Sequence, residues 1–180
     1  MTVRAAGEAD LPGILAIYNE VIRTSTAVYA DDPVTLADRT AWFAARQAQG
    51  YPVLVAEDAA GVAGFASFGD FRAWPGYRHT VEHSAHIRAD CRGRGFGRAL
   101  VAALFPLAEG LGKHVMIAGV DAENAASIAL HERLGFERVA HFREVGRKFD
   151  RWLDLVFLQR LLGKAPATGP RPHSLQDPEK

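Results

Sequence analysis

Residues 81–100 read VEHSAHIRADCRGRGFGRAL. Its first part, VEHSAHI, has the character of a strand, and its end has the apolar spacing of a helix. Between them, glycines allow positive φ angles and let backbone N–H groups approach a ligand closely. Because a helix N-terminus also favours negative charge, the stretch predicts a pyrophosphate-binding loop between a strand and a helix. Taken alone, the loop is also compatible with a flexible turn of solvated arginines.

Two known phosphate-binding loops can be compared with residues 92–98. A P-loop ends in Gly-Lys followed by Ser or Thr, and Gly97-Arg98-Ala99 lacks both residue types. A dinucleotide-binding loop has glycines at its first, third and sixth positions, whereas here they stand at the first, third and fifth. Asp121, near the end of a later strand, keeps a dinucleotide site as a weaker alternative.

Composition favours one compact domain without a strong overall electrostatic field. The chain has 180 residues, 48% of them hydrophobic, which is enough for a single core. Because 21 basic and 21 acidic residues cancel, attraction to nucleic acid or membranes would need a local patch, such as residues 88–98. The single cysteine, Cys91, offers no internal disulfide and no metal-binding pattern. Without a membrane-length apolar run or a signal-like start, we expect a cytoplasmic protein.

Hydrophobic periodicity predicts an α+β fold with helices on a mostly antiparallel sheet. Thr35 and Asp38 form a capping-box pattern before one helix, and Pro106 predicts a kink or an early end in another. Residues 1–162 are expected to form the domain. The proline-rich residues 163–180 are expected to be a disordered tail. Strands are predicted at 2–6, 52–58, 61–71, 79–88, 113–120, 136–145 and 151–162, and helices at 11–22, 35–50, 95–111 and 124–135.

Two motifs carry a resemblance to a known family. RGRGFGR at 92–98 resembles the acyl-CoA pyrophosphate loop of the GCN5-related N-acetyltransferase (GNAT) superfamily, and NAASIALHERLGF at 124–136 resembles its next motif. YNEVIRTSTAVY, FASFGDFR, TVEHS and GRKFDRWLDLVFLQ are similar to the phosphinothricin and methionine sulfone/sulfoximine N-acetyltransferases. The resemblance covers about residues 2–160. It implies about seven strands and four helices, a V-shaped splay between the fourth and fifth strands, acetyl-CoA as co-substrate, no metal, and a homodimer.

Glu82 is the candidate general base, because an ammonium group must lose a proton before it can attack a thioester. A solvated or salt-bridged glutamate is the alternative, and the match at TVEHS favours the catalytic role. In an extended strand, Thr80, Glu82, Ser84 and His86 share one face, while His79 and His83 share the other. His86 then points away from the other two histidines, which argues against a metal cluster.

The resemblance also assigns the acetyl-CoA contacts. It implies that the amide of Ile87 lies near the thioester carbonyl, where it would stabilise developing negative charge. Asn124 can cap its helix as well as contact CoA. His131 stands where relatives often have a tyrosine that protonates the CoA thiolate; contact with CoA without a chemical role is the alternative. The CoA-binding residues implied are Ala85, His86, Ile87, Arg92, Gly93, Arg94, Gly95, Phe96, Gly97, Arg98, Asn124, Ser127 and His131.

The loop before the Glu82 strand suggests the acceptor. An arginine can bind a carboxylate, and aromatic neighbours can shape a small pocket. We therefore expect transfer of an acetyl group to the α-amine of a small amino acid or glutamate-like analogue in a ternary complex, through Glu82. A protein N-terminus, a polyamine, or an acyl-CoA-binding module without catalysis are the alternatives. The substrate-binding residues implied are Tyr29, Phe71, Arg72, Ala73, Trp74, Glu82, His83 and Ser84. His86 departs from the tyrosine of relatives, so the pocket beside it is expected to differ.

Overall fold

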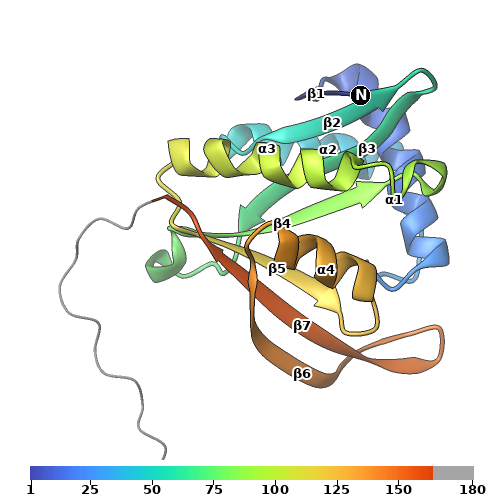
Figure 1. Cartoon of the computed structure of the whole chain (residues 1–180). Coiled ribbons are helices and arrows are strands. Elements are labelled where there is room, and N and C mark those ends of the chain that lie inside the picture. Colours follow the sequence, from blue (N-terminus) through green and yellow to red (C-terminus); the bar gives the residue numbers. More distant parts are fainter. Residues whose placement is uncertain (164–180) are drawn as a thin grey trace, which may run out of the picture.

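The computed structural model describes residues 1–163, which form one seven-stranded sheet with helices on both faces (Figure 1). The predicted α+β class, with seven strands and four α-helices, is confirmed. No helix among the described residues is both long and apolar enough to span a membrane. Apart from Gly163, the expected disordered tail lies outside the described residues. The strands are β1 (Thr2–Ala5), β2 (Val53–Asp58), β3 (Gly61–Asp70), β4 (Thr80–Ile87), β5 (Val115–Asp121), β6 (Glu137–Lys148) and β7 (Arg151–Leu161). The α-helices are α1 (Leu11–Thr24), α2 (Leu36–Ala48), α3 (Phe96–Gly110) and α4 (Ala125–Arg133).

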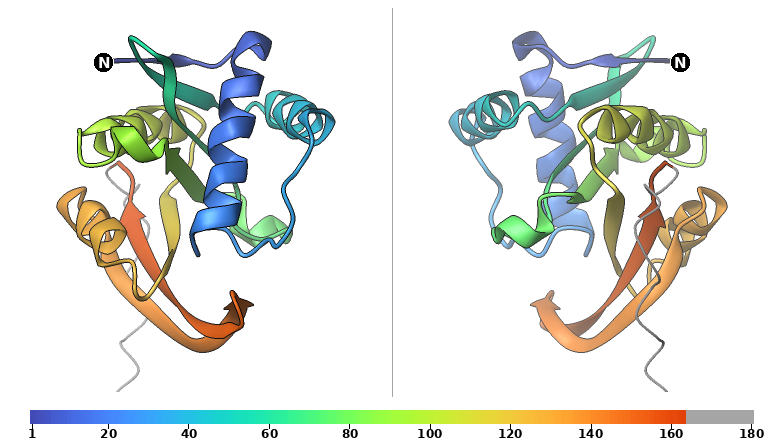
Figure 2. Two further views of the ribbon diagram at one scale, coloured as in Figure 1. Left: turned by 90° about the vertical axis from the view of Figure 1, so that its right-hand side faces the viewer. Right: turned by 90° about the vertical axis from the view of Figure 1, so that its left-hand side faces the viewer.

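The helices divide between the two faces of the sheet. Figure 2 shows α1 and α2 on one side and α3 and α4 on the other. One buried cluster joins α3 and α4 to the sheet, and it includes Leu100, Leu104 and Ile128. A second cluster beneath α1 and α2 includes Ile14 and Phe65. Burial on both faces explains why β2, β3 and β5 are largely apolar rather than strictly alternating.

The sheet opens between β4 and β5. The strand order is β1-β2-β3-β4-β5-β7-β6, and β4–β5 is its one parallel pair. These two strands are in register only from Thr80 to Glu82, opposite Val115 to Ile117, although both continue beyond that point. They therefore diverge towards their carboxyl ends (Figure 1). This confirms the predicted splay between the fourth and fifth strands.

Local predictions were mostly confirmed at the helix ends. The Thr35 hydroxyl accepts from the Asp38 amide at 3.2 Å, and the Asp38 carboxylate accepts from the Thr35 amide at 2.7 Å. Of the kink or early end predicted at Pro106, the early end was wrong, because α3 continues to Gly110. Pro106 is exposed, so water can satisfy the carbonyl left without an intrahelical donor.

The last hairpin extends further than its sequence pattern predicts. β6 continues to Lys148, and a two-residue turn then leads directly into β7. Phe149 and Asp150 have φ angles of 50° and 58°, so both central turn residues are left-handed. Such a turn matches the right-handed twist of paired strands, which explains its use despite the steric strain on Phe149.

Candidate active site

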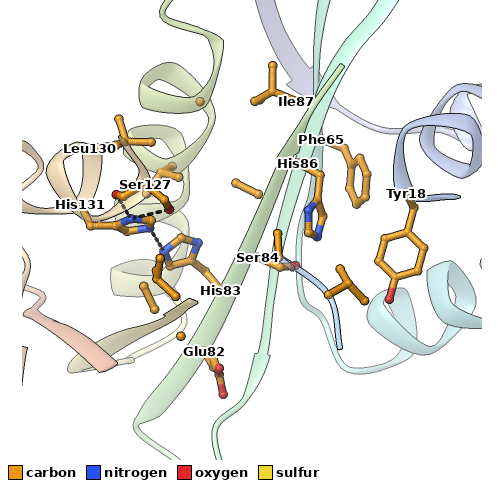
Figure 3. A pocket seen from close by; sticks show the side chains of 18 of the residues that line it. Tyr18, Phe65, Glu82, His83, Ser84, His86, Ile87, Ser127, Leu130 and His131 are labelled. Carbon is orange, nitrogen blue, oxygen red and sulfur yellow. Dashed lines mark hydrogen bonds between the residues drawn. The ribbon is translucent and has the colours of Figure 1, made fainter. Parts of the chain in front are cut away.

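A cavity of about 430 Å³ lies at the splay (Figure 3). It is lined on both sides of β4, so it reaches both faces of the sheet, and consecutive residues 82–87 of that strand contribute to it. On the α3 and α4 side, the lining residues are Gly97, Val101, Asn124, Ser127, Leu130 and His131. On the α1 and α2 side, they are Tyr18, Ala27, Val28, Arg39, Trp42 and Arg46, with Phe65 from β3.

The glycine loop has the conformation that the sequence predicts. Gly93 and Gly95 have φ angles of 73° and 89°, which side-chain-bearing residues rarely adopt. The loop leads into α3, whose first intrahelical hydrogen bond is donated by Ala99 to the Gly95 carbonyl at 3.0 Å. The amides of Phe96, Gly97 and Arg98 precede that bond, as the unpaired N–H groups of a helix N-terminus do. The buried Phe96 side chain anchors this end of α3 in the core.

The arginines around the loop differ in whether nearby carboxylates neutralise their charge. Arg88 pairs with Asp58 at 3.1 Å and Asp90 at 2.7 Å, and Arg94 reaches Asp58 at 3.4 Å. Arg92 donates to the Ile87 carbonyl at 3.3 Å. Within residues 1–163, neither Arg92 nor Arg98 forms an ion pair, and both are exposed. The predicted basic patch therefore consists mainly of these two side chains and the helix N-terminus.

The β3–β4 ladder determines which peptide groups of β4 face the splay. The Arg88 amide donates to Ala63, and the Phe71 amide donates to Thr80, which fixes the hydrogen-bonded pairs of this antiparallel ladder. By alternation, the peptide groups of His86 are directed to β3, while those of Ala85 and Ile87 are directed to the splay. The amides of Ala85 and Ile87 can therefore meet a ligand there. The implied backbone contact from His86 does not fit, because its peptide groups belong to the ladder.

Glu82 lies at the closed end of the splay, where the β4–β5 pairing stops. Its side chain is directly above Gly119 of β5, since a Cβ at Gly119 would come within 3.0 Å of Oε1. Burial raises the pKa of the Glu82 carboxyl, and nearby Arg72 opposes this shift. A carboxylate with a raised pKa is a better proton acceptor than a solvated one, as general-base chemistry requires.

His83 and His131 form a buried pair across the splay (Figure 3). His131 Nδ1 lies 2.7 Å from the Ser127 carbonyl oxygen, so Nδ1 carries the proton. Burial lowers the pKa of His131, and it lowers that of His83 to about 3, so both rings are neutral. His131 Nε2 therefore accepts from His83 Nε2–H at 3.1 Å. His131 is buried rather than on the helix surface, since its side chain packs on His83 and Phe136.

Asn124 caps α4, as expected from its position before the helix. Its side-chain oxygen accepts from the Ser127 amide at 3.1 Å. Both residues also line the cavity. The cap thus coexists with a position beside any ligand in the splay.

His86 points to the opposite side of β4 from His83, as the predicted alternation requires (Figure 3). Its ring contacts Tyr18 and Phe65, with centroids 5.6 Å and 5.3 Å away. Burial, and then the nearby Arg39, lower the pKa of His86 to about 4. No group of three His, Cys, Asp or Glu side chains in residues 1–163 could hold a metal ion. Cys91 is buried, and burial raises the pKa of its thiol.

The predicted acceptor loop lies at the edge of the cavity rather than in its lining. Arg72 is close enough to Glu82 to affect its pKa, and its guanidinium stacks on Phe71. Ala73 and Trp74 are exposed, and Phe71 lines a separate hollow of about 270 Å³. Tyr29 packs its ring against Gly146 of β6. Of the predicted acceptor residues, the structure brings together Glu82, His83 and Ser84 in the cavity and places Arg72 beside them.

The segment between α1 and α2 forms part of the cavity wall and is fastened to β6. Lys148 donates to the carbonyls of Ser25 at 2.9 Å and Val28 at 2.6 Å. The Thr26 hydroxyl bonds the buried Asp121 carboxylate, which also accepts from the Glu123 amide. Both carboxylate oxygens of Asp121 are thus occupied by hydrogen bonds within the protein, which weakens the alternative of a dinucleotide-binding site. Nothing in the sequence around Lys148 indicates this role, because its pattern is that of an ordinary exposed lysine.

The comparisons with known proteins agree with this architecture. Residues 1–137 match the family model described as "Acetyltransferase (GNAT) domain", so the chain belongs to the GNAT family and is an N-acetyltransferase.

It is 56% identical over 159 residues to the L-methionine sulfoximine/L-methionine sulfone acetyltransferase of Pseudomonas paraeruginosa, covering 88% of this chain and 92% of that one. Identity to the phosphinothricin N-acetyltransferase of Alcaligenes faecalis is 38% over 170 residues, covering 94% and 86%. The crystal structure of a phosphinothricin acetyltransferase from Sinorhizobium meliloti in complex with acetyl-CoA matches with a TM-score of 0.89 and 38% identity, covering 98% and 96%.

Proposed function

We propose that this enzyme transfers an acetyl group from acetyl-CoA to the α-amine of a small amino acid or glutamate-like analogue, by direct transfer in a ternary complex. The observation that carries the proposal is that one cavity joins Glu82, with its raised pKa, to the splay-facing amides of Ala85 and Ile87. The names of the relatives support this acceptor class, because they specify methionine sulfoximine, methionine sulfone and phosphinothricin.

Acetyl-CoA fits the residues on the α3 and α4 side of the cavity. The free amides of Phe96, Gly97 and Arg98, with the loop at Gly93 and Gly95, suit the pyrophosphate. The Arg92 and Arg98 side chains, with Arg94 nearby, add positive charge. Ala85 and Ile87 would bind the pantetheine arm through their peptide groups, with Asn124 and Ser127 on the facing wall. When bound, the thioester supplies the acetyl group.

Glu82 then prepares the amine for attack. Its carboxylate accepts a proton from the acceptor's ammonium group, directly or through a water molecule, and frees the nitrogen lone pair. The Ile87 amide stabilises the negative charge that develops on the thioester oxygen. When the carbonyl re-forms, the C–S bond breaks and CoA leaves as a thiolate, which takes up a proton as the acylated nitrogen loses one. The neutral, hydrogen-bonded state of His131 favours a role in positioning the cavity wall over one as proton donor to the departing thiolate.

Arg72 would bind the acceptor's α-carboxylate beside Glu82. Its effect on the Glu82 pKa supports this position. A polyamine would need several carboxylates to hold its cationic tail, whereas the acceptor side of the cavity carries Arg39 and Arg46. The charge of the site therefore favours amino acids over polyamines.

We also propose that the enzyme is a homodimer, in which a second copy covers an apolar surface on β6 and β7. Its exposed side chains are Val139, Phe142, Val145, Phe149 and Trp152, the last of them 61% exposed. The hollow lined by Phe71, Tyr77 and Phe157 continues this surface. Sedimentation equilibrium should give twice the mass of the chain, and a monomeric mass for Trp152→Arg.

The proposed function is tested by measuring thiol release from acetyl-CoA with a panel of amines. Methionine sulfone, methionine sulfoximine and phosphinothricin should stimulate release, while spermidine and a peptide N-terminus should not. Binding of CoA without amine-stimulated release would instead identify a binding module. Cys91 is buried, so a blank containing protein alone measures any slow reaction of its thiol with the reagent.

A further inference from the structure

Two arginines on α2 line the cavity without forming ion pairs. Arg39 is only 9% exposed, and its Nε has no hydrogen-bond partner within residues 1–163. Arg46 Nε is also buried and without a partner there, although Nη1 donates to Gln49 at 2.9 Å. Neither guanidinium is within ion-pair distance of a carboxylate in the described chain.

Both guanidinium groups lie over the face of the sheet that carries Glu82 and His86. A Cβ at Gly69 would come within 2.6–2.8 Å of the Arg46 guanidinium, and Gly69 is the ladder partner of Glu82. Arg39 stacks on Tyr18, with its Cζ 4.0 Å from the ring centroid, and Tyr18 contacts His86. The two arginines are seven residues apart and so lie on one face of α2. Arg46 is therefore beside the Glu82 end of the cavity, and Arg39 is beside the His86 end.

An unpaired buried cation is costly unless something compensates for its desolvation. Burial lowers the pKa of Arg39, which is evidence of that cost. The guanidinium lies over the rings of Tyr18 and Trp42, which holds its plane and contributes some compensation, but Nε remains without a hydrogen-bond partner within residues 1–163. His86 beside it is neutral, and no carboxylate of residues 1–163 lies within ion-pair distance of the Arg39 guanidinium. The missing partner is best supplied by a ligand.

We propose that Arg39, supported by Arg46, binds the oxygen atoms at the side-chain end of the acceptor. This rests on the proposed function, since it assumes that the amine lies at Glu82 and the α-carboxylate at Arg72. The side chain then extends along β4 towards His86 and Arg39. The ligand class is an amino acid whose side chain carries a carboxylate, phosphinate, sulfone or sulfoximine group, because a planar guanidinium donates to two such oxygens at once.

The test compares methionine sulfone with methionine, which differ only in the sulfur oxygens, in wild type and Arg39→Met. We expect kcat/KM for methionine sulfone to fall at least tenfold in Arg39→Met, while that for methionine stays within about twofold, a difference expected for the loss of a charged hydrogen-bond donor. Calorimetry in the presence of CoA should show the same selective loss in Kd. Arg23→Met, an exposed change on α1, is the matched control and should behave as wild type.

An equal loss for both acceptors, or no loss, would overturn the proposal. The proposal would also be overturned if Arg39→Met kept the preference for methionine sulfone but changed kcat/KM for succinyl-CoA as donor. That result would place the donor's acyl group at Arg39. If Arg39→Met does not fold, Arg39→Lys is used in its place. Because lysine lacks the planar guanidinium, the ratio of kcat/KM for methionine sulfone to kcat/KM for methionine should fall at least threefold. An unchanged ratio overturns the proposal. The proposed function fails separately, if wild type releases no CoA with either acceptor.

Discussion

His131 Nε2 lies 3.1 Å from His83 Nε2, so one hydrogen bond joins α4 to β4 across the opening between β4 and β5. No ladder connects the two walls there, because the pairing ends at Glu82 and Ile117. The chain of donors and acceptors runs from His83 through His131 to the Ser127 carbonyl. It leaves His83 Nδ1 as a buried acceptor without a partner among the described residues. The pair therefore helps to fix the width of the splay.

Substitutions of His83 and His131 should have coupled effects on the free energy of unfolding. His131→Phe leaves the His83 N–H without its acceptor, and His83→Phe leaves the His131 lone pair without its donor, so each change should cost about 1–3 kcal/mol. The double variant removes both groups and should cost less than the sum by about 1 kcal/mol. Urea unfolding of the four proteins measures this coupling. Additive losses would show that the hydrogen bond contributes nothing to the free energy of unfolding.

Acid should destabilise the protein through its buried histidines. The pKa of His86 is lowered from 6.5 to about 4, and that of His83 to about 3. A group with a depressed folded-state pKa contributes stability above its ordinary pKa, and this contribution is lost as the pH falls towards the folded value. For His86 the loss reaches about 3 kcal/mol. His86→Phe should therefore flatten the fall in stability between pH 6.5 and 4; curves parallel to wild type would contradict this assignment.

Alanine substitutions at two loop glycines should have different effects: one should lower stability, and the other should weaken acetyl-CoA binding. Gly95→Ala forces a side chain into the left-handed region and should destabilise the fold by about 1–2 kcal/mol. Gly97 is helical, and a Cβ there would lie 3.4 Å from Leu130 and 3.7 Å from Ile87, so alanine fits. Gly97→Ala should keep or raise the melting temperature and increase the KM for acetyl-CoA, because the Cβ narrows the cavity. An unchanged KM would remove Gly97 from the CoA site.

The sequence predicted the elements whose signals are local. The capping box at Thr35 and the positive φ angles at Gly93 and Gly95 depend on neighbouring residues only, and both appear as expected. Alternation along residues 80–87 also separated His86 from His83 correctly, since β4 has no bulge. The parallel β4–β5 pair and its early divergence depend on residues 35 positions apart, so they could be expected only from the family resemblance.

Prediction of the site failed where tertiary packing decides burial. Arg39 is three residues before Trp42, and Arg46 is three residues after Phe43, on the face of α2 that packs on the sheet. An arginine at a core-facing helical position is the signal that could have indicated them. Lys148 has no such signal, because its acceptors are backbone carbonyls more than 100 residues away in the sequence.

Removing the charge of Glu82 should stabilise the protein near neutral pH. Burial raises the folded-state pKa of this carboxyl, so its contribution to stability is present at low pH and is lost as the pH rises through the folded value. Glu82→Gln should therefore melt at a higher temperature than wild type at pH 7.5, by about 2–4 °C for each kcal/mol released. At pH 4 the two proteins should differ little. A lower melting temperature for the variant at pH 7.5 would mean that the carboxylate is stabilised in the fold.

In the proposed reaction, Glu82 accepts the proton of the acceptor amine. The most direct measurement is kcat/KM for methionine sulfone as a function of pH, with saturating acetyl-CoA, in wild type and Glu82→Gln. We expect an acidic limb in the wild-type profile above the ordinary glutamate pKa, a loss of about 10²–10⁴-fold in kcat/KM for the variant, and no such limb in the variant's profile. A variant that keeps the wild-type kcat/KM and the same acidic limb would contradict this role of Glu82.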